Sequence, residues 1–357
     1  MRPDILRLVA YRQGAAAPKD SFKLSSNENP CDPIPAIVEA IAASSINRYP
    51  DDSASVIRNR LADRHGVSVE CVHVGAGSVA ILAQLIVAAA APGDEVIYAW
   101  RSFEAYPGLI TVAGATGVPI PLRADYTHDL DGMAAAVTTK TRLILVCTPN
   151  NPTGTIVTAE DFDRFMAKVP TTVLVVLDEA YSEFVSDPSS VRGMELIERY
   201  SNLVVLRTFS KAYGLAGLRF GYVVGADYVL NAARAVAIPL SVIEPAQRAA
   251  IAALDNLDVL LERVRQLCVS RDRVWDSLTE QGWSVPKPHG NFVWLATGEH
   301  TAAASAIFLK HGIVARALGV DGLRISIGEA ESVEKLLAGA AEVLRTLPLG
   351  SAVAALD

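Results

Sequence analysis

The 357-residue chain is poor in the residues that build metal and disulfide sites. It has four cysteines and six histidines, and none of them forms a pair or a set at the spacing of a metal-binding motif. Scattered cysteines are more typical of reduced thiols than of a disulfide framework. We therefore expect a cytoplasmic protein without a metal site.

The chain also lacks an excess of positive charge and a long apolar run. Its formal net charge is −7, which argues against a nucleic-acid or anionic membrane surface as a partner. The longest apolar run, residues 79–91, contains Gln84 and is too short to cross a bilayer. No charged and then apolar leader stands at the start. We expect no nucleic-acid partner and no membrane association.

Apolar residues are abundant, at 51% of the chain, and many of them form short runs rich in branched side chains. Most of these runs show no polar alternation, and segments of helical length separate several of them. This pattern predicts an α/β fold, with a mainly parallel sheet covered by helices on both faces. The expected strands are residues 71–74, 96–98, 118–122, 143–146, 173–177, 203–206 and 220–224.

The character of the chain changes after about residue 246. A long charged segment of helical pattern is followed by short strand-like runs at 291–295, 313–315 and 323–327, and by a helical end. Because the chain also exceeds the length of one ordinary core, we predict three parts. They are an N-terminal arm (1–29), a large domain (30–245) and a small α+β domain (246–357).

Polar groups follow four of the predicted strands. Gly75-Ala-Gly-Ser78 follows the first strand and Asn150-Asn-Pro-Thr-Gly154 the fourth, while Asp178 ends the fifth, and Ser210 and Lys211 follow the sixth. Ligands of open α/β sheets bind beyond the carboxyl ends of the strands. We therefore expect these segments to form one site.

Lys211 lies between a hydroxyl, Ser210, and a cation, Arg219. A lysine near desolvating groups and cations can lose its proton and attack a carbonyl as a neutral amine. Hydroxyls and an arginine suit a phosphate. Pyridoxal 5'-phosphate has both an aldehyde and a phosphate and is carried by a lysine, so the segment predicts this cofactor.

The glycine turn after the first strand allows an alternative from another class. Gly75-x-Gly77-x-x-Ala80 matches the fingerprint of an NAD-linked dehydrogenase in form, but Asp94 and Glu95 precede the next strand instead of closing it. We favour an anion site at the start of the following helix, against a plain tight turn.

Other residues have two interpretations each. Asp178 suits a protonated ring nitrogen or a helix N-cap, and Asn151 and Tyr181 suit a ring oxygen or belong to a turn. Phe103 stacks on a planar ring or belongs to the core. Arg324 captures a carboxylate or lies at the surface of an edge strand.

Together these residues resemble the fold-type I pyridoxal-phosphate aminotransferases, and among them the histidinol-phosphate aminotransferase family. The resemblance runs almost from end to end. It implies a large domain with a mainly parallel seven-stranded sheet between helices, and a small α+β domain. The matching segments are residues 24–30, 48–50, 150–154, 178–181, 209–219, 291–292 and 323–324.

The resemblance also implies roles for single residues. Lys211 carries the cofactor as an imine and then moves the proton, while Asp178 and Tyr181 complete the catalytic set. Tyr49 reaches the phosphate in the partner subunit, which implies a homodimer with shared sites. The further cofactor contacts are Asn151 and Tyr181 at the ring oxygen, Phe103 at the ring face, and Ala76, Gly77, Ser78, Thr208, Ser210 and Arg219 at the phosphate. The substrate contacts are Tyr11, Asn151, Arg316 and Arg324.

One departure bears on the substrate. Val79 and Ala80 stand where the family has an acidic residue, and together with residues 100–107 this resembles a branch of aromatic amino acid aminotransferases. The resemblance implies amino transfer from phenylalanine, tyrosine or tryptophan to a 2-oxo acid such as 2-oxoglutarate. The alternatives are histidinol phosphate as the donor, an NAD-linked dehydrogenase, and a non-catalytic domain that binds the cofactor for regulation.

Overall fold

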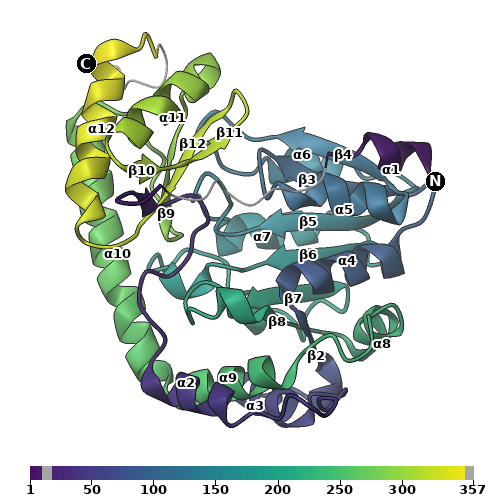
Figure 1. Cartoon of the computed structure of the whole chain (residues 1–357). Coiled ribbons are helices and arrows are strands. Elements are labelled where there is room, and N and C mark those ends of the chain that lie inside the picture. Colours follow the sequence, from purple (N-terminus) through teal and green to yellow (C-terminus); the bar gives the residue numbers. More distant parts are fainter. Residues whose placement is uncertain (10–17, 350–357) are drawn as a thin grey trace.

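The computed structural model describes residues 1–9 and 18–349, and its centre is a seven-stranded sheet in the order β2-β8-β7-β6-β5-β3-β4 (Figure 1). Strand β8 pairs antiparallel with β2 and β7, and all other neighbours are parallel. The predicted α/β class with a mainly parallel sheet is confirmed. The strands are β2 (Val72–Ala76), β3 (Glu95–Trp100), β4 (Thr116–Pro121), β5 (Thr141–Cys147), β6 (Leu174–Asp178), β7 (Leu203–Thr208) and β8 (Phe220–Gly225).

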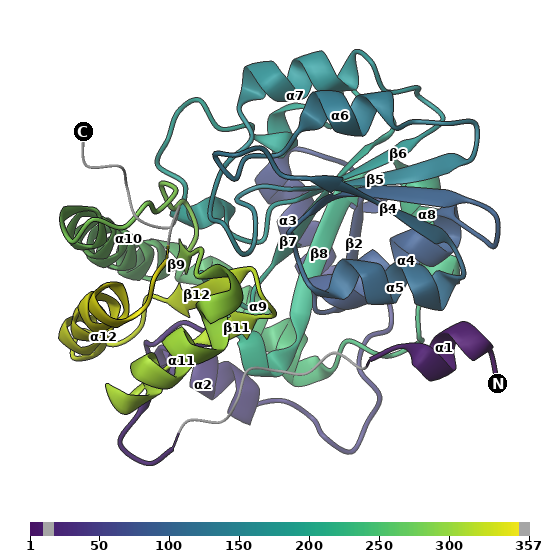
Figure 2. The same cartoon turned by 90° about the horizontal axis from the view of Figure 1, so that it is seen from above.

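Helices cover both faces of this sheet, as Figure 2 shows. Successive strand side chains point to opposite faces, so Val96 and Tyr98 join one apolar cluster while Ile97 and Ala99 join the other. One face carries α4 (Ser78–Ala89), α5 (Ala105–Ala113) and α8 (Asp227–Ala235), and the other carries α6 (Leu130–Ala135) and α7 (Ala159–Met166). Because both faces pack against apolar clusters, the strands show no regular alternation of apolar and polar residues.

A second, three-stranded antiparallel sheet forms near the C-terminus in the order β11-β12-β9. Its strands are β9 (Phe292–Leu295), β11 (Arg316–Leu318) and β12 (Gly322–Ser326), and the helices around it are α10 (Leu257–Glu280), α11 (Thr301–Lys310) and α12 (Ser332–Thr346). Arg324 therefore lies on the central strand and is 7% exposed. Its interpretation as a surface residue of an edge strand is wrong.

The N-terminal elements of the chain pack against several later elements. Strand β1 (Phe22–Lys23) pairs in parallel with β10 (Ile313–Val314), and α1 (Pro3–Arg7) lies against α5. Helix α9 (Glu244–Asp255) packs on α2 (Pro35–Ala42) and α3 (Ser55–His65). The division at residues 29 and 245 stays a prediction. Short 3-10 helices cover Val69–Cys71, Ser182–Phe184, Gly193–Glu195, Ala216–Leu218 and Gly298–His300.

None of the helices in the described ranges combines the length and the apolar character that a membrane crossing requires.

Candidate active site

The polar groups predicted at the strand ends meet beyond the carboxyl edge of the large sheet. Asp178 closes β6 and lies opposite Cys147 at the end of β5. Lys211 follows β7, and its Nζ lies 6.0 Å from the centre of the Tyr181 ring. Parallel strands deliver their ends to one edge, which is why segments far apart in sequence form one site.

The main chain of the N-terminal segment holds Lys211. Its Nζ donates a hydrogen bond to the carbonyl oxygen of Ser26 at 3.0 Å. Burial lowers the pKa of Lys211 to about 7, and the positive charge of Arg324 acts in the same direction. Near neutral pH a large fraction of the amine is therefore unprotonated and able to attack an aldehyde.

Asp178 is 6% exposed and its two carboxylate oxygens differ. Oδ2 accepts a hydrogen bond from the Tyr106 hydroxyl at 2.8 Å, whereas Oδ1 is buried with no hydrogen-bond partner among the described residues. Burial raises the pKa of Asp178 to about 6, and the Tyr106 hydrogen bond opposes this. The N-cap of the next short helix is Tyr181, so the N-cap interpretation of Asp178 is wrong.

A candidate phosphate cradle lies where β2 meets α4. Helix α4 begins at Ser78 with Gly77 as its N-cap, at φ +83° and without a side-chain cap. The Arg219 guanidinium lies so close that a Cβ on Gly77 would overlap it, and its Nη1 lies 3.4 Å from Ser210 Oγ. The positive end of a helix, a hydroxyl and a guanidinium together suit a phosphate group.

Two other predicted phosphate contacts lie beside this cradle. Ala76 ends β2 directly before Gly77 and pairs with Phe220 of β8. The Thr208 hydroxyl accepts a hydrogen bond from the Ser210 main-chain N–H at 3.1 Å. Thr208 therefore holds the turn that presents Ser210.

Arg324 and Asn151 meet across the two sheets. Arg324 Nη1 donates to Asn151 Oδ1 at 2.6 Å, and Nη2 donates to the Ser25 carbonyl oxygen at 2.8 Å. Asn27 Nδ2 donates to the Tyr181 hydroxyl at 2.9 Å. The predicted substrate arginine is thus adjacent to the predicted contacts of the ring oxygen.

These residues fit pyridoxal 5'-phosphate. The unpartnered Oδ1 of Asp178 can accept a hydrogen bond from a protonated ring nitrogen, and the cradle around Gly77 and Arg219 has the donors that a phosphate needs. An ionised carboxylate oxygen buried without a partner is unfavourable, so a cationic ring nitrogen at this position would stabilise it.

Three site residues were missed at the sequence level. Tyr106 lies one helical turn after Phe103, with the two rings 5.5 Å apart, and this spacing was a usable signal. Asn27 adopts φ +52°, and Ser326 Oγ donates to Asn27 Oδ1 at 2.9 Å. Nothing in the local sequence indicates a contact between residues 299 positions apart.

Other predicted residues are not brought into this network. Tyr49 is 85% exposed, and Tyr11 lies outside the described residues. Phe103 packs on the apolar cluster of the sheet, so its stacking role stays a prediction. Arg316 pairs with Glu104, a residue for which no role was predicted.

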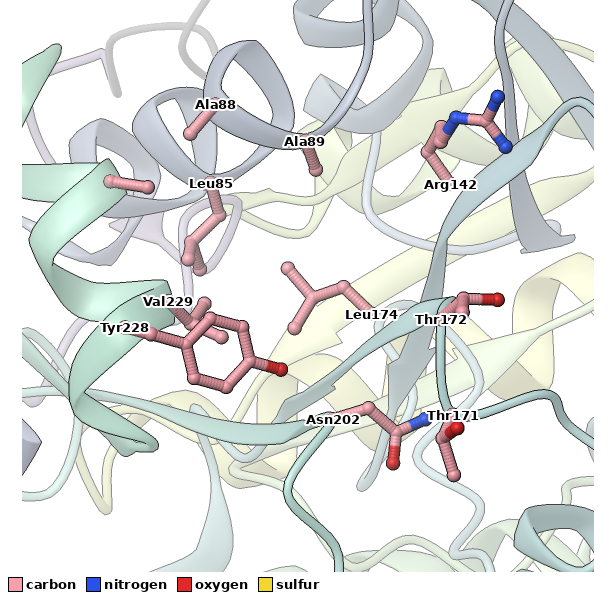
Figure 3. A pocket seen from close by; sticks show the side chains of 11 residues that line it. Leu85, Ala88, Ala89, Arg142, Thr171, Thr172, Leu174, Asn202, Tyr228 and Val229 are labelled. Carbon is pink, nitrogen blue, oxygen red and sulfur yellow. The ribbon is translucent and has the colours of Figure 1, made fainter.

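A pocket of about 190 Å³ lies at the opposite edge of the sheet (Figure 3). It is bounded by α4 and α8, and by the starts of β5 and β6, where Arg142 and Leu174 lie. Arg142 is its one charged lining residue, and that side chain pairs with Asp94. The pocket contains none of the predicted site residues, so the candidate site is the carboxyl edge.

No three His, Cys, Asp or Glu side chains among residues 1–9 and 18–349 are arranged to hold a metal ion.

Comparison with known proteins places these features in a family context. A family model described as aminotransferase class I and II matches residues 19–339. A protein of Cutibacterium acnes named aromatic amino acid aminotransferase is 49% identical over 330 residues, covering 92% of this chain and 94% of that one. A Streptomyces avermitilis protein of the same name is 48% identical over 337 residues, covering 93% and 94%.

Solved structures agree with the fold. The histidinol-phosphate aminotransferase of Sinorhizobium meliloti in complex with pyridoxal-5'-phosphate has a TM-score of 0.85 at 28% identity, covering 97% of this chain and 98% of that one. The aspartate aminotransferase of Thermus thermophilus with maleate has a TM-score of 0.80 at 23% identity, covering 91% and 92%. At that identity the second likeness concerns the fold alone.

Proposed function

The chain belongs to the class I and II aminotransferases, which depend on pyridoxal 5'-phosphate, and from this we propose that it transfers the amino group of aromatic amino acids to a 2-oxo acid. The name shared by relatives at 48–49% identity supports the aromatic donor. The position of Lys211, Tyr181 and Asp178 at the carboxyl edge of the large sheet supports the chemistry. Membership of this family excludes the NAD-linked dehydrogenase.

Lys211 has two tasks in this proposal. When bound, the cofactor supplies an aldehyde that condenses with amines and a protonated ring that withdraws electrons from the substrate α-carbon. The neutral Lys211 amine, favoured by its pKa of about 7, first binds the cofactor. With substrate in its place on the cofactor, Lys211 Nζ would take the proton from the substrate α-carbon as a base and, as an acid, deliver it to the former aldehyde carbon of the cofactor.

The remaining residues bind and orient. Asp178 holds the proton of the ring nitrogen, and Asn151 and Tyr181 bind the ring oxygen. Phe103 contacts the ring face, and residues 100–106 with the arm form the aromatic side-chain pocket. Arg324 binds the substrate carboxylate, and Tyr11 and Arg316 are assigned to substrate binding as well. The phosphate contacts are Ala76, Gly77, Ser78, Thr208, Ser210 and Arg219.

A homodimer with shared sites belongs to the same proposal. Tyr49 and Ile46 are 85% and 91% exposed, and Ile238 is 75% exposed. Their segments lie side by side, because the Leu240 N–H donates to Asp52 at 2.8 Å. This apolar surface suits a second copy, in whose site Tyr49 would bind the phosphate. A cytoplasmic location stays a prediction from the cysteine pattern.

The decisive experiment compares amino donors with 2-oxoglutarate as the acceptor. We expect kcat/KM for phenylalanine, tyrosine or tryptophan to exceed that for histidinol phosphate by at least about tenfold, the effect of about 1.4 kcal/mol in transition-state binding. A far higher value for histidinol phosphate would replace the aromatic assignment with the alternative that the Sinorhizobium structure represents. Lys211→Ala protein serves as the blank.

A further inference from the structure

Arg316 forms a bidentate ion pair that crosses between the two sheets. Its Nε donates to Glu104 Oε2 at 3.1 Å, and its Nη2 lies 3.0 Å from Oε2 and 3.2 Å from Oε1. The side chains are only 16% and 26% exposed. Glu104 follows Phe103 at the start of α5, so its position is fixed by the same segment that carries the ring-stacking candidate.

Arg316 is also the direct neighbour of the substrate arginine. In the β11–β12 pair, Arg316 lies opposite Arg324, and directly opposed residues of antiparallel strands share a face of the sheet. Arg324 reaches Asn151 from that face. The anionic group of a donor that binds Arg324, a carboxylate or a phosphate, therefore lies beside Arg316 and its partner Glu104.

The negative charge of Glu104 affects which anionic group a donor can place near Arg316. A phosphate monoester carries about −1.5 to −2 charges near neutral pH, and it binds best to an arginine that offers its whole fork. Glu104 occupies part of that fork, cancels its charge, and repels a dianion. The carboxylate of an aromatic amino acid carries a single charge, which Arg324 alone can match, so these donors do not need the fork of Arg316.

We propose that Glu104 is a specificity-determining residue, which holds Arg316 and so excludes phosphate-bearing amino donors while admitting aromatic ones. This inference rests on the proposed aminotransferase function and deepens it. Arg316 was predicted as a substrate contact, and an arginine alone can bind either a phosphate or a carboxylate. The ion pair with Glu104 removes that ambiguity in favour of donors without a phosphate.

The test is Glu104→Gln, which keeps the shape of the side chain and removes its charge. The holoenzyme is mixed with the amino donor alone, so that the two carboxylates of 2-oxoglutarate cannot compete for Arg316, and the half-reaction is followed by absorbance. We expect the ratio of the second-order rate constants, histidinol phosphate over phenylalanine, to rise at least about tenfold. The reason is that Glu104 no longer competes with the substrate phosphate for Arg316. Inorganic phosphate should inhibit the phenylalanine half-reaction more strongly in the variant.

Asp321→Asn is the matched control. Asp321 pairs with Arg101, so this variant also breaks an ion pair between the segment after β3 and the small sheet, but it leaves Glu104 on Arg316. Its ratio should equal that of the wild type. An unchanged ratio and unchanged phosphate inhibition in Glu104→Gln, with a melting temperature near that of the wild type, would overturn the inference.

Failure of the proposed function is distinguishable, because it appears in the unmodified protein. A wild type that prefers histidinol phosphate contradicts both ideas. A wild type that prefers phenylalanine, combined with an unresponsive Glu104→Gln, contradicts only the role of Glu104. Glu104→Ala gives a second reading of the same ratio if the glutamine variant does not fold.

Discussion

Burial changes the pKa values of the ionisable side chains Lys211 and Asp178 in this site. Removing water disfavours the charged form of any group, so the pKa of Lys211 falls to about 7 while that of Asp178 rises to about 6. The first shift produces a nucleophilic amine. The second is opposed by one hydrogen bond from Tyr106, and a cationic ring nitrogen at the free oxygen would complete the ionisation of Asp178.

Cofactor capture should therefore depend on pH in a defined direction. Only the neutral Lys211 amine attacks the aldehyde, so the capture rate should rise with pH, reach half its maximum near pH 7, and level off above pH 8. A lysine at its ordinary pKa near 10.4 would still be gaining rate at pH 9. Stopped-flow absorbance of the cofactor-free protein mixed with pyridoxal 5'-phosphate measures this, with borohydride trapping and Lys211→Arg as the control. A midpoint above pH 9 would refute the lowered pKa.

Tyr106→Phe tests a positioning residue that acts through Asp178. Loss of the hydroxyl removes a group that lowers the pKa of Asp178, so more of the carboxyl is protonated at low pH and cannot pair with the ring nitrogen. We expect the Kd for the cofactor to rise about tenfold at pH 6, in line with the loss of a hydrogen bond to a charged group, and less at pH 8. Tyr98→Phe, from the same aromatic cluster, should show no such pH dependence. An equal loss at both pH values would indicate a packing defect instead.

Among the elements, the junction of β2 and α4 has the geometry that suits a phosphate. Gly77 is both the N-cap of α4 and the residue on which the Arg219 guanidinium lies. Its φ of +83° belongs to the region that side chains with a Cβ avoid. Glycine at this position therefore allows both the positive φ of the backbone and the close approach of the Arg219 guanidinium.

Gly77→Ala should therefore weaken the cofactor site. The added methyl group strains the backbone and displaces Arg219, and we expect the Kd for pyridoxal 5'-phosphate to rise at least about tenfold, as when a charge-assisted hydrogen bond is lost. Gly217→Ala is the control in the segment next to Arg219, because a Cβ there meets no atom within 4 Å. Fluorescence titration of the cofactor-free variants gives both constants. Equal affinity in the two variants would exclude the proposed cradle.

The whole molecule places its two sheets so that groups from distant segments meet, and it leaves Tyr49 exposed. Arg324 reaches Asn151 across 173 positions of sequence, and Arg316 reaches Glu104 across 212. These contacts exist only if the small sheet is docked on the large one. The exposed surface around Tyr49 suggests that docking continues between two copies.

Subunit mixing tests the shared site. If Tyr49 acts in the partner's site, Tyr49→Ala and Lys211→Ala homodimers are both impaired, but a mixed dimer has one site with both residues. Refolding an equal mixture should restore about a quarter of the wild-type activity, since half of the dimers are mixed and each has one intact site. Activity at the level of the two parents, with mixed dimers shown by mass spectrometry, would place Tyr49 outside the site.

Local patterns predicted much of this protein, because they depend on neighbours in sequence. Branched apolar runs specify buried strands wherever the sheet lies, so residues 143–146 and 173–177 fall within or beside β5 and β6. Glycine and a following helix indicate an anion site. Asp178 ends one strand and Lys211 follows another, and the carboxyl ends of parallel strands lie at the same edge of a sheet. The class of fold and the cofactor were predicted correctly at this level, and the catalytic residues stay a prediction.

Tertiary structure alone decided the rest. The reversed direction of β8, the end of β10 at Val314 and the central position of Arg324 depend on which strands pair. Burial then sets the ionisation of Lys211 and Asp178, and docking of the sheets brings Glu104 onto Arg316. These properties arise from water exclusion and charge proximity between distant segments, which no local pattern of residues contains.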